Sequence, residues 1–192
     1  MGLVSEMPSG PGVISEEVIA EIAATVPPPV ATFLLTSQTT SAELIAQQRR
    51  CRKNNLQLCD RVDLRVYEEL HETLPGVKIV QVIHVAGEQS VREALESADQ
   101  VDALLLDSGN QSLPVKQLGG TGRTHDWSLS ARIVSESRIP VFLAGGLNPD
   151  NVADAIAAVR PFGVDLCSGV RTDDKLDEAK LKAFMRAVQA TG

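Results

Sequence analysis

The sequence contains few aromatic residues and few cysteines. Aromatic side chains make up 3% of the 192 residues, so a hydrophobic core must consist mainly of Ala, Val, Leu and Ile. The three cysteines, Cys51, Cys59 and Cys167, form no CxxC pair and are odd in number, which argues against a disulfide framework and against a zinc knuckle. We therefore expect a reduced, cytoplasmic protein that uses no metal ion and no cofactor.

Positive charge and long apolar runs are also scarce. The chain has 18 Lys and Arg residues against 25 Asp and Glu residues, a net charge of −7, so neither nucleic acid nor an anionic membrane surface is expected as a partner. The uncharged stretch of residues 26–42 holds three prolines and many hydroxyl side chains and is unsuited to span a membrane. Residues 1–12 are acidic and rich in proline and glycine, unlike a signal peptide.

Short apolar runs alternate with amphipathic stretches along the chain. The runs predict seven strands, at residues 2–5, 31–35, 56–58, 78–83, 103–106, 141–143 and 163–166. The amphipathic stretches predict seven helices, at residues 15–26, 41–52, 64–73, 90–98, 127–137, 148–159 and 177–191. Strict alternation predicts a parallel sheet. We expect residues 1–192 to form a single α/β domain, an incomplete (β/α) TIM-type barrel of seven βα units.

The last three predicted strands lead into residues that suit a phosphate site. Asp107 follows one apolar run, and glycine-rich cradles follow the fifth, sixth and seventh strands. Such cradles bind phosphate through backbone N–H groups, because glycine allows a close approach. The cradle residues are Gly119, Gly120, Thr121, Gly122, Gly145, Gly146, Ser168 and Gly169.

Two alternatives remain open for this region. A doubly wound sheet is the alternative fold, although it usually has a single phosphate loop, after its first strand. The alternative interpretation of the site is that the glycines serve only tight turns and that Asp107 caps a loop.

The same region carries the motifs LLLD…GGTGRTHDW, PVFLAGGLNPDNVADAI and FGVDLCSGV. Together they resemble the phosphoribosylanthranilate isomerase family of tryptophan biosynthesis, closely from about Asp102 to the C-terminus and more weakly upstream. The resemblance implies a (β/α)-barrel isomerase of the aldose–ketose type, with a phosphorylated small molecule as ligand. It also implies that Asp107 is the general acid of an Amadori rearrangement, protonating the sugar ring oxygen of N-(5-phosphoribosyl)anthranilate.

Two features of that family have no counterpart here. The family opens on a strand ending in KICG, whose cysteine is the general base, and it carries an arginine after its second strand, where residues 9–12 of this sequence read SGPG. Cys167 and His84, each at the end of a predicted strand, are candidates to replace the base. A small buried cysteine and a hydrogen-bonded structural histidine are the alternative interpretations.

These departures lead to two expectations. The chain as it stands should have weak or no isomerase activity, and a divergent or non-catalytic barrel that binds a phosphorylated sugar is the alternative function. A barrel without its first βα unit also leaves two strand edges unpaired, so we expect a homodimer that covers this seam.

Overall fold

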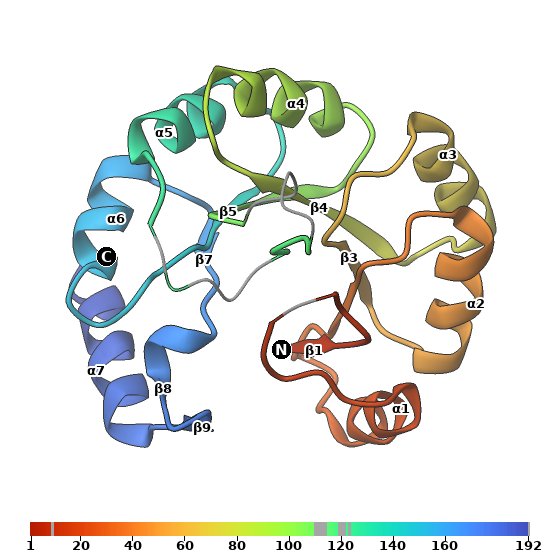
Figure 1. Cartoon of the computed structure of the whole chain (residues 1–192), viewed down its shortest axis with the longest axis horizontal. Coiled ribbons are helices and arrows are strands. Elements are labelled where there is room, and N and C mark those ends of the chain that lie inside the picture. Colours follow the sequence, from red (N-terminus) through yellow and green to blue (C-terminus); the bar gives the residue numbers. More distant parts are fainter. Residues whose placement is uncertain (9, 110–114, 119–121, 123, 192) are drawn as a thin grey trace.

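The computed structural model describes residues 1–8, 10–109, 115–118, 122 and 124–191. Its main sheet is parallel, and its strands lie side by side in the order in which they occur along the chain. The sheet curls into an open ring with the helices on its outer side (Figure 1). The strands are β1 (Gly2–Val4), β2 (Phe33–Thr36), β3 (Asn55–Leu58), β4 (Lys78–His84), β5 (Ala103–Asp107), β6 (Val141–Leu143) and β7 (Gly163–Val164).

Five of the seven helices that follow the main-sheet strands begin at a side chain that satisfies a backbone donor. The first N–H groups of a helix have no partner inside the helix, so a short polar side chain just before it stabilises the end. Ser15, Thr40, Asp63, Asp126 and Asp177 each accept such a bond. The helices are α1 (Glu16–Thr25), α2 (Ser41–Cys51), α3 (Leu64–Thr73), α4 (Glu88–Ala98), α5 (Trp127–Glu136), α6 (Val152–Val159) and α7 (Glu178–Gln189).

All seven predicted strands and all seven predicted helices are present, and the incomplete TIM-type barrel is confirmed. The main difference lies at α6, which begins four residues later than predicted. Asn148 Oδ1 accepts hydrogen bonds from the backbone N–H of Asp150 at 2.8 Å and of Asn151 at 3.2 Å. This side chain forms an Asx turn ahead of the helix and delays its start.

Two elements after β7 were not predicted. A 3-10 helix, η1 (Ser168–Val170), is followed by a short hairpin made of β8 (Arg171–Thr172) and β9 (Lys175–Leu176). The hairpin turn holds Asp173 and Asp174 at φ values of 50° and 58°. Aspartate tolerates this left-handed conformation better than most residues, but the pair is a weaker hairpin signal than Asn-Gly or Asp-Gly.

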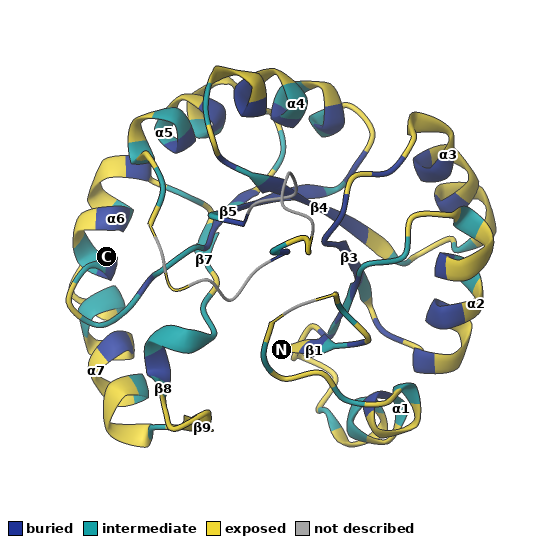
Figure 2. Cartoon of the chain, in the orientation of Figure 1, coloured by how far each residue is buried: buried dark blue, intermediate teal, exposed yellow. Residues whose placement is uncertain are grey.

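Side-chain alternation along the strands separates two apolar layers. Residues such as Leu34, Leu56 and Leu104 point outward and are fully buried beneath the helices. Figure 2 shows the matching arrangement of the helices, whose buried faces turn toward the strands. The inward side chains form a smaller cluster, which includes Val82 and Leu105. Side chains alternate between the two faces of the sheet with a period of two. Every second residue at the carboxyl end of a strand therefore points into the ring, where it meets its counterparts from the neighbouring strands.

The ring is open between β1 and β7. No ladder joins these two strands in the described part of the chain. Val13 forms one parallel bridge with Val4, and the backbone N–H of Ile14 donates to the Val4 carbonyl at 3.0 Å, so the segment after β1 covers the end of its free edge. Among the described residues, no helix combines the length and the apolar character needed to cross a bilayer.

Candidate functional site

Asp107 is the last residue of β5 and lies at the carboxyl end of the sheet. It is 8% exposed, and its Oδ1 accepts a hydrogen bond from the backbone N–H of Ser108 at 2.7 Å. Burial raises the pKa of this carboxyl, and the Ser108 N–H and the charge of the nearby His84 oppose that rise. A raised pKa favours the protonated form, which is the form that a general acid needs.

A second carboxylate, that of Asp165, lies beside Asp107 and was missed in the sequence. The backbone N–H of Asp165 donates to the Leu143 carbonyl at 2.8 Å, which extends the pairing of β7 with β6 by one residue. The pairing of β5 with β6, extended by one residue in the same way, puts Asp107 opposite Ala144. Asp107 and Asp165 thus lie on the two sides of Ala144. The signal in the sequence was the one used for Asp107, an aspartate directly after an apolar run.

The environment of Asp165 also raises its pKa. The pKa of Asp165 is raised to about 6. The larger cause is its enclosure by the surrounding chain, and the second is the negative charge of Asp107. Its side chain is nevertheless exposed to solvent, at an opening that Met1, Gly2 and Val164 also line. Water at this opening stabilises the carboxylate and limits the rise.

Four of the predicted phosphate-binding residues line one polar pocket, together with Asp107 and Asp165. Gly145 has a φ of 84°, and a Cβ atom at this position would come within 2.9 Å of the Ser108 backbone N, so only glycine fits there without strain. The four residues are Gly122, Gly145, Gly146 and Ser168. Ser168 opens η1, whose first N–H groups have no partner within the helix. Barrels often bind phosphate at such a short extra helix after their last strands.

Of the remaining predicted cradle residues, Gly169 is the one that the structure describes. Gly119, Gly120 and Thr121 fall outside the described residues. Gly169 packs against the loop before α6, where a Cβ atom would lie 1.9 Å from the Leu147 carbonyl oxygen. Its lack of a side chain therefore allows η1 to sit close to that loop.

A second, more apolar pocket adjoins the polar one. It is lined by side chains from β1 to β5, among them Val4, Leu35 and Val82, with Met7 and Leu118 from the loops. Asp107, Asp165 and Cys167 line both pockets. The carboxylates and the Cys167 thiol therefore lie at the junction between a polar, glycine-rich end and an apolar end.

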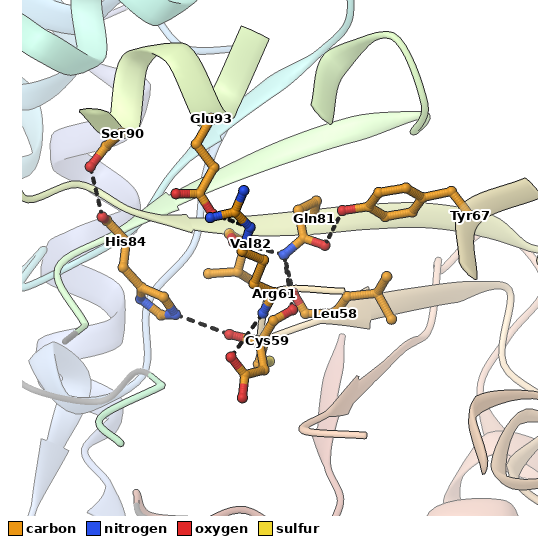
Figure 3. A network of polar contacts seen from close by, with 10 residues as sticks. Leu58, Cys59, Arg61, Tyr67, Gln81, Val82, His84, Ser90 and Glu93 are labelled. Carbon is orange, nitrogen blue, oxygen red and sulfur yellow. Dashed lines mark hydrogen bonds and ion pairs between the residues drawn. The ribbon is translucent and has the colours of Figure 1, made fainter. Parts of the chain in front are cut away.

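His84 lines neither of these pockets. Its Nε2 lies 3.0 Å from the Cys59 carbonyl oxygen, to which it donates, and its own backbone carbonyl accepts a hydrogen bond from Ser90 Oγ at 3.1 Å (Figure 3). Its Nδ1 is buried, with no hydrogen-bond partner in the described part of the chain, and it faces Gly109, where a Cβ atom would lie 2.2 Å away. The structure therefore favours the alternative of a structural histidine.

The two cysteines near the site differ in environment. The pKa of Cys59 is raised to about 12, mainly by burial and secondly by the negative charge of Asp107. Its thiol therefore stays protonated near neutral pH. Cys167 is only partly buried and lies directly before η1. Of the predicted candidates for the base, Cys167 is thus the one at the site.

A polar network behind β4 holds the loops around the site. Tyr67 of α3 donates its hydroxyl to Gln81 Oε1 at 2.8 Å, and Gln81 Nε2 lies 3.1 Å from the Asp60 carbonyl oxygen. Figure 3 shows Gln81, which bonds to Tyr67, and His84, which bonds to the Cys59 carbonyl, on the same strand. Asp60 also forms an ion pair with Lys116, which connects the loop after β5 to the end of β3.

The fold and the site define a class of protein, a (β/α) barrel with a small-ligand site at the carboxyl ends of its strands. The family model described as N-(5'phosphoribosyl)anthranilate (PRA) isomerase matches residues 8–187, and the chain belongs to this family. A relative from Methanocella arvoryzae, named N-(5'-phosphoribosyl)anthranilate isomerase, is 32% identical over 192 residues, which cover 100% of this chain and 88% of the relative. A relative of the same name from Halobacterium salinarum is 37% identical over 198 residues, with 100% and 86% covered.

Solved structures agree with this assignment. The phosphoribosyl anthranilate isomerase of Thermotoga maritima superposes with a TM-score of 0.82 at 28% identity, over 98% of this chain and 87% of that one. A phosphoribosyl anthranilate isomerase in complex with reduced 1-(o-carboxyphenylamino)-1-deoxyribulose 5-phosphate gives a TM-score of 0.79 at 26% identity, over 98% and 86%. These relatives give no support to the alternative of a non-catalytic barrel.

Proposed function

We propose that the protein catalyses the isomerisation of N-(5'-phosphoribosyl)anthranilate in tryptophan biosynthesis. The observation that carries this proposal is the junction of two pockets of opposite character at Asp107 and Asp165. A glycine-rich polar end suits the phosphate of the substrate, an apolar end suits its aromatic ring, and the carboxylates lie between them, where the sugar would react. The similarity to isomerases of this substrate supports the assignment.

In this proposal Asp107 is the general acid. The rearrangement begins when the bond between C1 and the ring oxygen of the sugar breaks, and a proton donor at that oxygen lowers the barrier. The raised pKa of Asp107 keeps the donor protonated in a larger fraction of the molecules. The phosphate would be bound by backbone N–H groups of Gly146 and η1, which places the sugar ring over Asp107.

The direct test is to assay the 192-residue chain with N-(5'-phosphoribosyl)anthranilate. Wild type should convert the substrate at a low rate, and Asp107→Asn should lower kcat by about 10²–10⁴-fold, the usual contribution of a positioned acid. Asp99→Asn, at an exposed position after α4, is the matched control and should leave kcat unchanged. Full activity of Asp107→Asn would contradict the role given to Asp107.

The phosphate end is tested separately by ligand binding. Ribose 5-phosphate at 100 times its dissociation constant should stabilise the protein by about 2.7 kcal/mol, read as a rise in melting temperature. Gly146→Asp, which puts a carboxylate into the cradle, should remove this rise. Wild type that shows no stabilisation even at concentrations well above millimolar would contradict phosphate binding.

We also propose that two copies of the chain associate across the opening between β1 and β7. The isomerase of Thermotoga maritima is described as dimeric in one of its structures. An open sheet edge next to exposed apolar side chains favours association of this kind.

A further inference from the structure

The proposed substrate carries two anionic groups, the phosphate of its sugar and the carboxylate of its anthranilate ring. The apolar pocket that suits the ring is lined by Asp107 and Asp165, and its lining, as far as the structure describes it, includes no Lys or Arg. The loop after β1, residues 5–14, also has no Lys or Arg in its sequence. A carboxylate on the ring therefore needs a positive charge that reaches the rim of this pocket from another element.

Arg171 brings a guanidinium to this rim. Gly10 and Pro11 line the apolar pocket, and Arg171 Nη2 lies close to the next residue, Gly12, where a Cβ atom would lie 3.7 Å from it. The side chain thus extends from β8 toward the loop after β1, across the opening of the ring (Figure 1).

The backbone of Arg171 is also anchored near the site. Cys167, which lines both pockets, directly precedes η1, and Arg171 directly follows it. At the 3-10 rise of about 2 Å per residue, these two backbones lie roughly 8 Å apart. The long side chain of Arg171 therefore starts beside the junction of the two pockets and ends at the loop that borders the apolar one.

The guanidinium of Arg171 has most of its hydrogen-bonding capacity left for a ligand. Its side chain donates one hydrogen bond to a described residue, from Nη1 to the Asp174 carbonyl oxygen at 3.3 Å. In the described part of the chain, it forms no ion pair with a carboxylate. Arginine has five N–H donors in a planar fork, which fits the two oxygens of a carboxylate.

Two other cationic side chains near the carboxyl ends of the strands already face carboxylates. Lys116, after β5, is paired with Asp60, and Arg61, after β3, lies 4.0 Å from Glu93. A positive charge that is offset by a neighbouring carboxylate attracts a second anion less strongly. Arg171 therefore offers its charge to a ligand more fully than either of them.

Building on the proposed function, we propose that Arg171 binds the carboxylate of the anthranilate ring and so orients the ring in the apolar pocket. Two N–H groups of the guanidinium donate to the two carboxylate oxygens. The ring nitrogen substituent, which is next to the carboxylate, then points toward the junction, where Asp107 faces the sugar. Arg171 is thus a substrate-binding residue that selects a ring with a carboxylate beside its nitrogen, and it takes no part in the proton transfers.

The experiment compares two ligands that differ only in this carboxylate. One is reduced 1-(o-carboxyphenylamino)-1-deoxyribulose 5-phosphate, the compound bound in the related isomerase structure, and the other is its 1-(phenylamino) analogue. Calorimetric titration of the 192-residue chain gives both dissociation constants for wild type, Arg171→Gln and Arg171→Lys. The measurement needs no turnover, so it is independent of the catalytic rate.

Wild type should bind the carboxylate compound about 10–100-fold more tightly than the analogue, the range expected for hydrogen bonds to a charged group. Arg171→Gln should reduce this ratio to less than about threefold and leave the affinity for the analogue nearly unchanged. Arg171→Lys keeps the charge but loses the planar fork, so its ratio should lie between the two. Arg186→Gln, which removes an exposed arginine from the last turn of α7, is the matched control and should keep the wild-type ratio.

Thermal melts confirm that each variant is folded, and the outcomes separate the role of Arg171 from the proposed function. A preference for the carboxylate compound that persists in Arg171→Gln would overturn the assignment, because another group would then bind the carboxylate. Equal affinity of wild type for the two compounds would also overturn it, while leaving the phosphate site intact. A wild-type chain that binds neither compound would contradict the proposed function and, with it, the role of Arg171.

Discussion

At the scale of single residues, the two carboxylates of the site are costly to stability. Asp165 has a folded-state pKa of about 6 against an ordinary 3.8, so between these values the folded protein binds the proton more tightly than the unfolded chain does. Stability therefore falls as pH rises through this window. The favourable contribution of the protonated group is present below about pH 4 and is lost above about pH 6.

Asp165→Asn should therefore raise the melting temperature at pH 8, because the amide carries no charge beside Asp107. The advantage over wild type should shrink toward zero as pH falls to 4. Melting curves at pH 4, 6 and 8 measure it, with exposed Asp99→Asn showing no such trend. An advantage that is the same at all three pH values would mean that the charge of Asp165 is not responsible.

At the scale of secondary structure elements, η1 depends on the contact of Gly169 with the loop before α6. A Cβ atom at this position would lie 1.9 Å from the Leu147 carbonyl oxygen and 3.0 Å from its carbonyl carbon. Backbone atoms cannot move aside as a flexible side chain can, so η1 itself must shift. Ser168 lies at the start of η1 and lines the polar pocket.

Gly169→Ala should destabilise the protein by about 1–3 kcal/mol, the usual cost of overpacking, and should weaken ribose 5-phosphate binding. Denaturant unfolding and ligand titration measure the two effects. Gly87→Ser is the matched control, because nothing lies within 4 Å of a Cβ there and serine is a favoured residue before a helix. Equal stability and affinity in wild type and Gly169→Ala would contradict the packing argument.

At the scale of the whole molecule, the opening between β1 and β7 decides how the chain behaves in solution. Val13 covers only the end of the β1 edge, and Arg171 Nη2 comes close to Gly12, where a Cβ atom would lie 3.7 Å from it. The loop after β1 and the β8–β9 hairpin thus approach each other, and among the described residues no strand pairing joins them. Phe162 is 71% exposed beside Phe142, with ring centroids 5.4 Å apart, so an apolar surface adjoins the β7 edge.

Sedimentation at tens of micromolar should show a dimer, and Phe162→Ser should weaken the association at least tenfold, because it removes a large apolar contact. Leu64→Ser, which removes a 59% exposed apolar side chain from α3 on the other side of the ring (Figure 1), is the control and should leave the dimer intact. A monomer with slowly exchanging amides at residues 163–166 would instead indicate closure within one chain.

The sequence by itself determined the element order and half of the site. Apolar runs and helix-capping residues are local signals, so the seven strands and seven helices could be predicted, as could Asp107 and the glycines beside it. The local signal failed after β7, because η1 packs through Gly169 against Leu147, far from it in sequence, and because the Asp173-Asp174 turn of the hairpin is a weak turn signal.

Only the tertiary structure decided which groups meet. The pairing of β5, β6 and β7 set Asp165 beside Asp107, and the curl of the sheet joined a polar pocket to an apolar one at these carboxylates. The hydrogen bond from His84 to the Cys59 carbonyl holds that histidine beside Asp107 but outside both pockets. The physical reason is that burial and charge–charge distances, which set pKa values and access to a ligand, depend on neighbours brought together by folding.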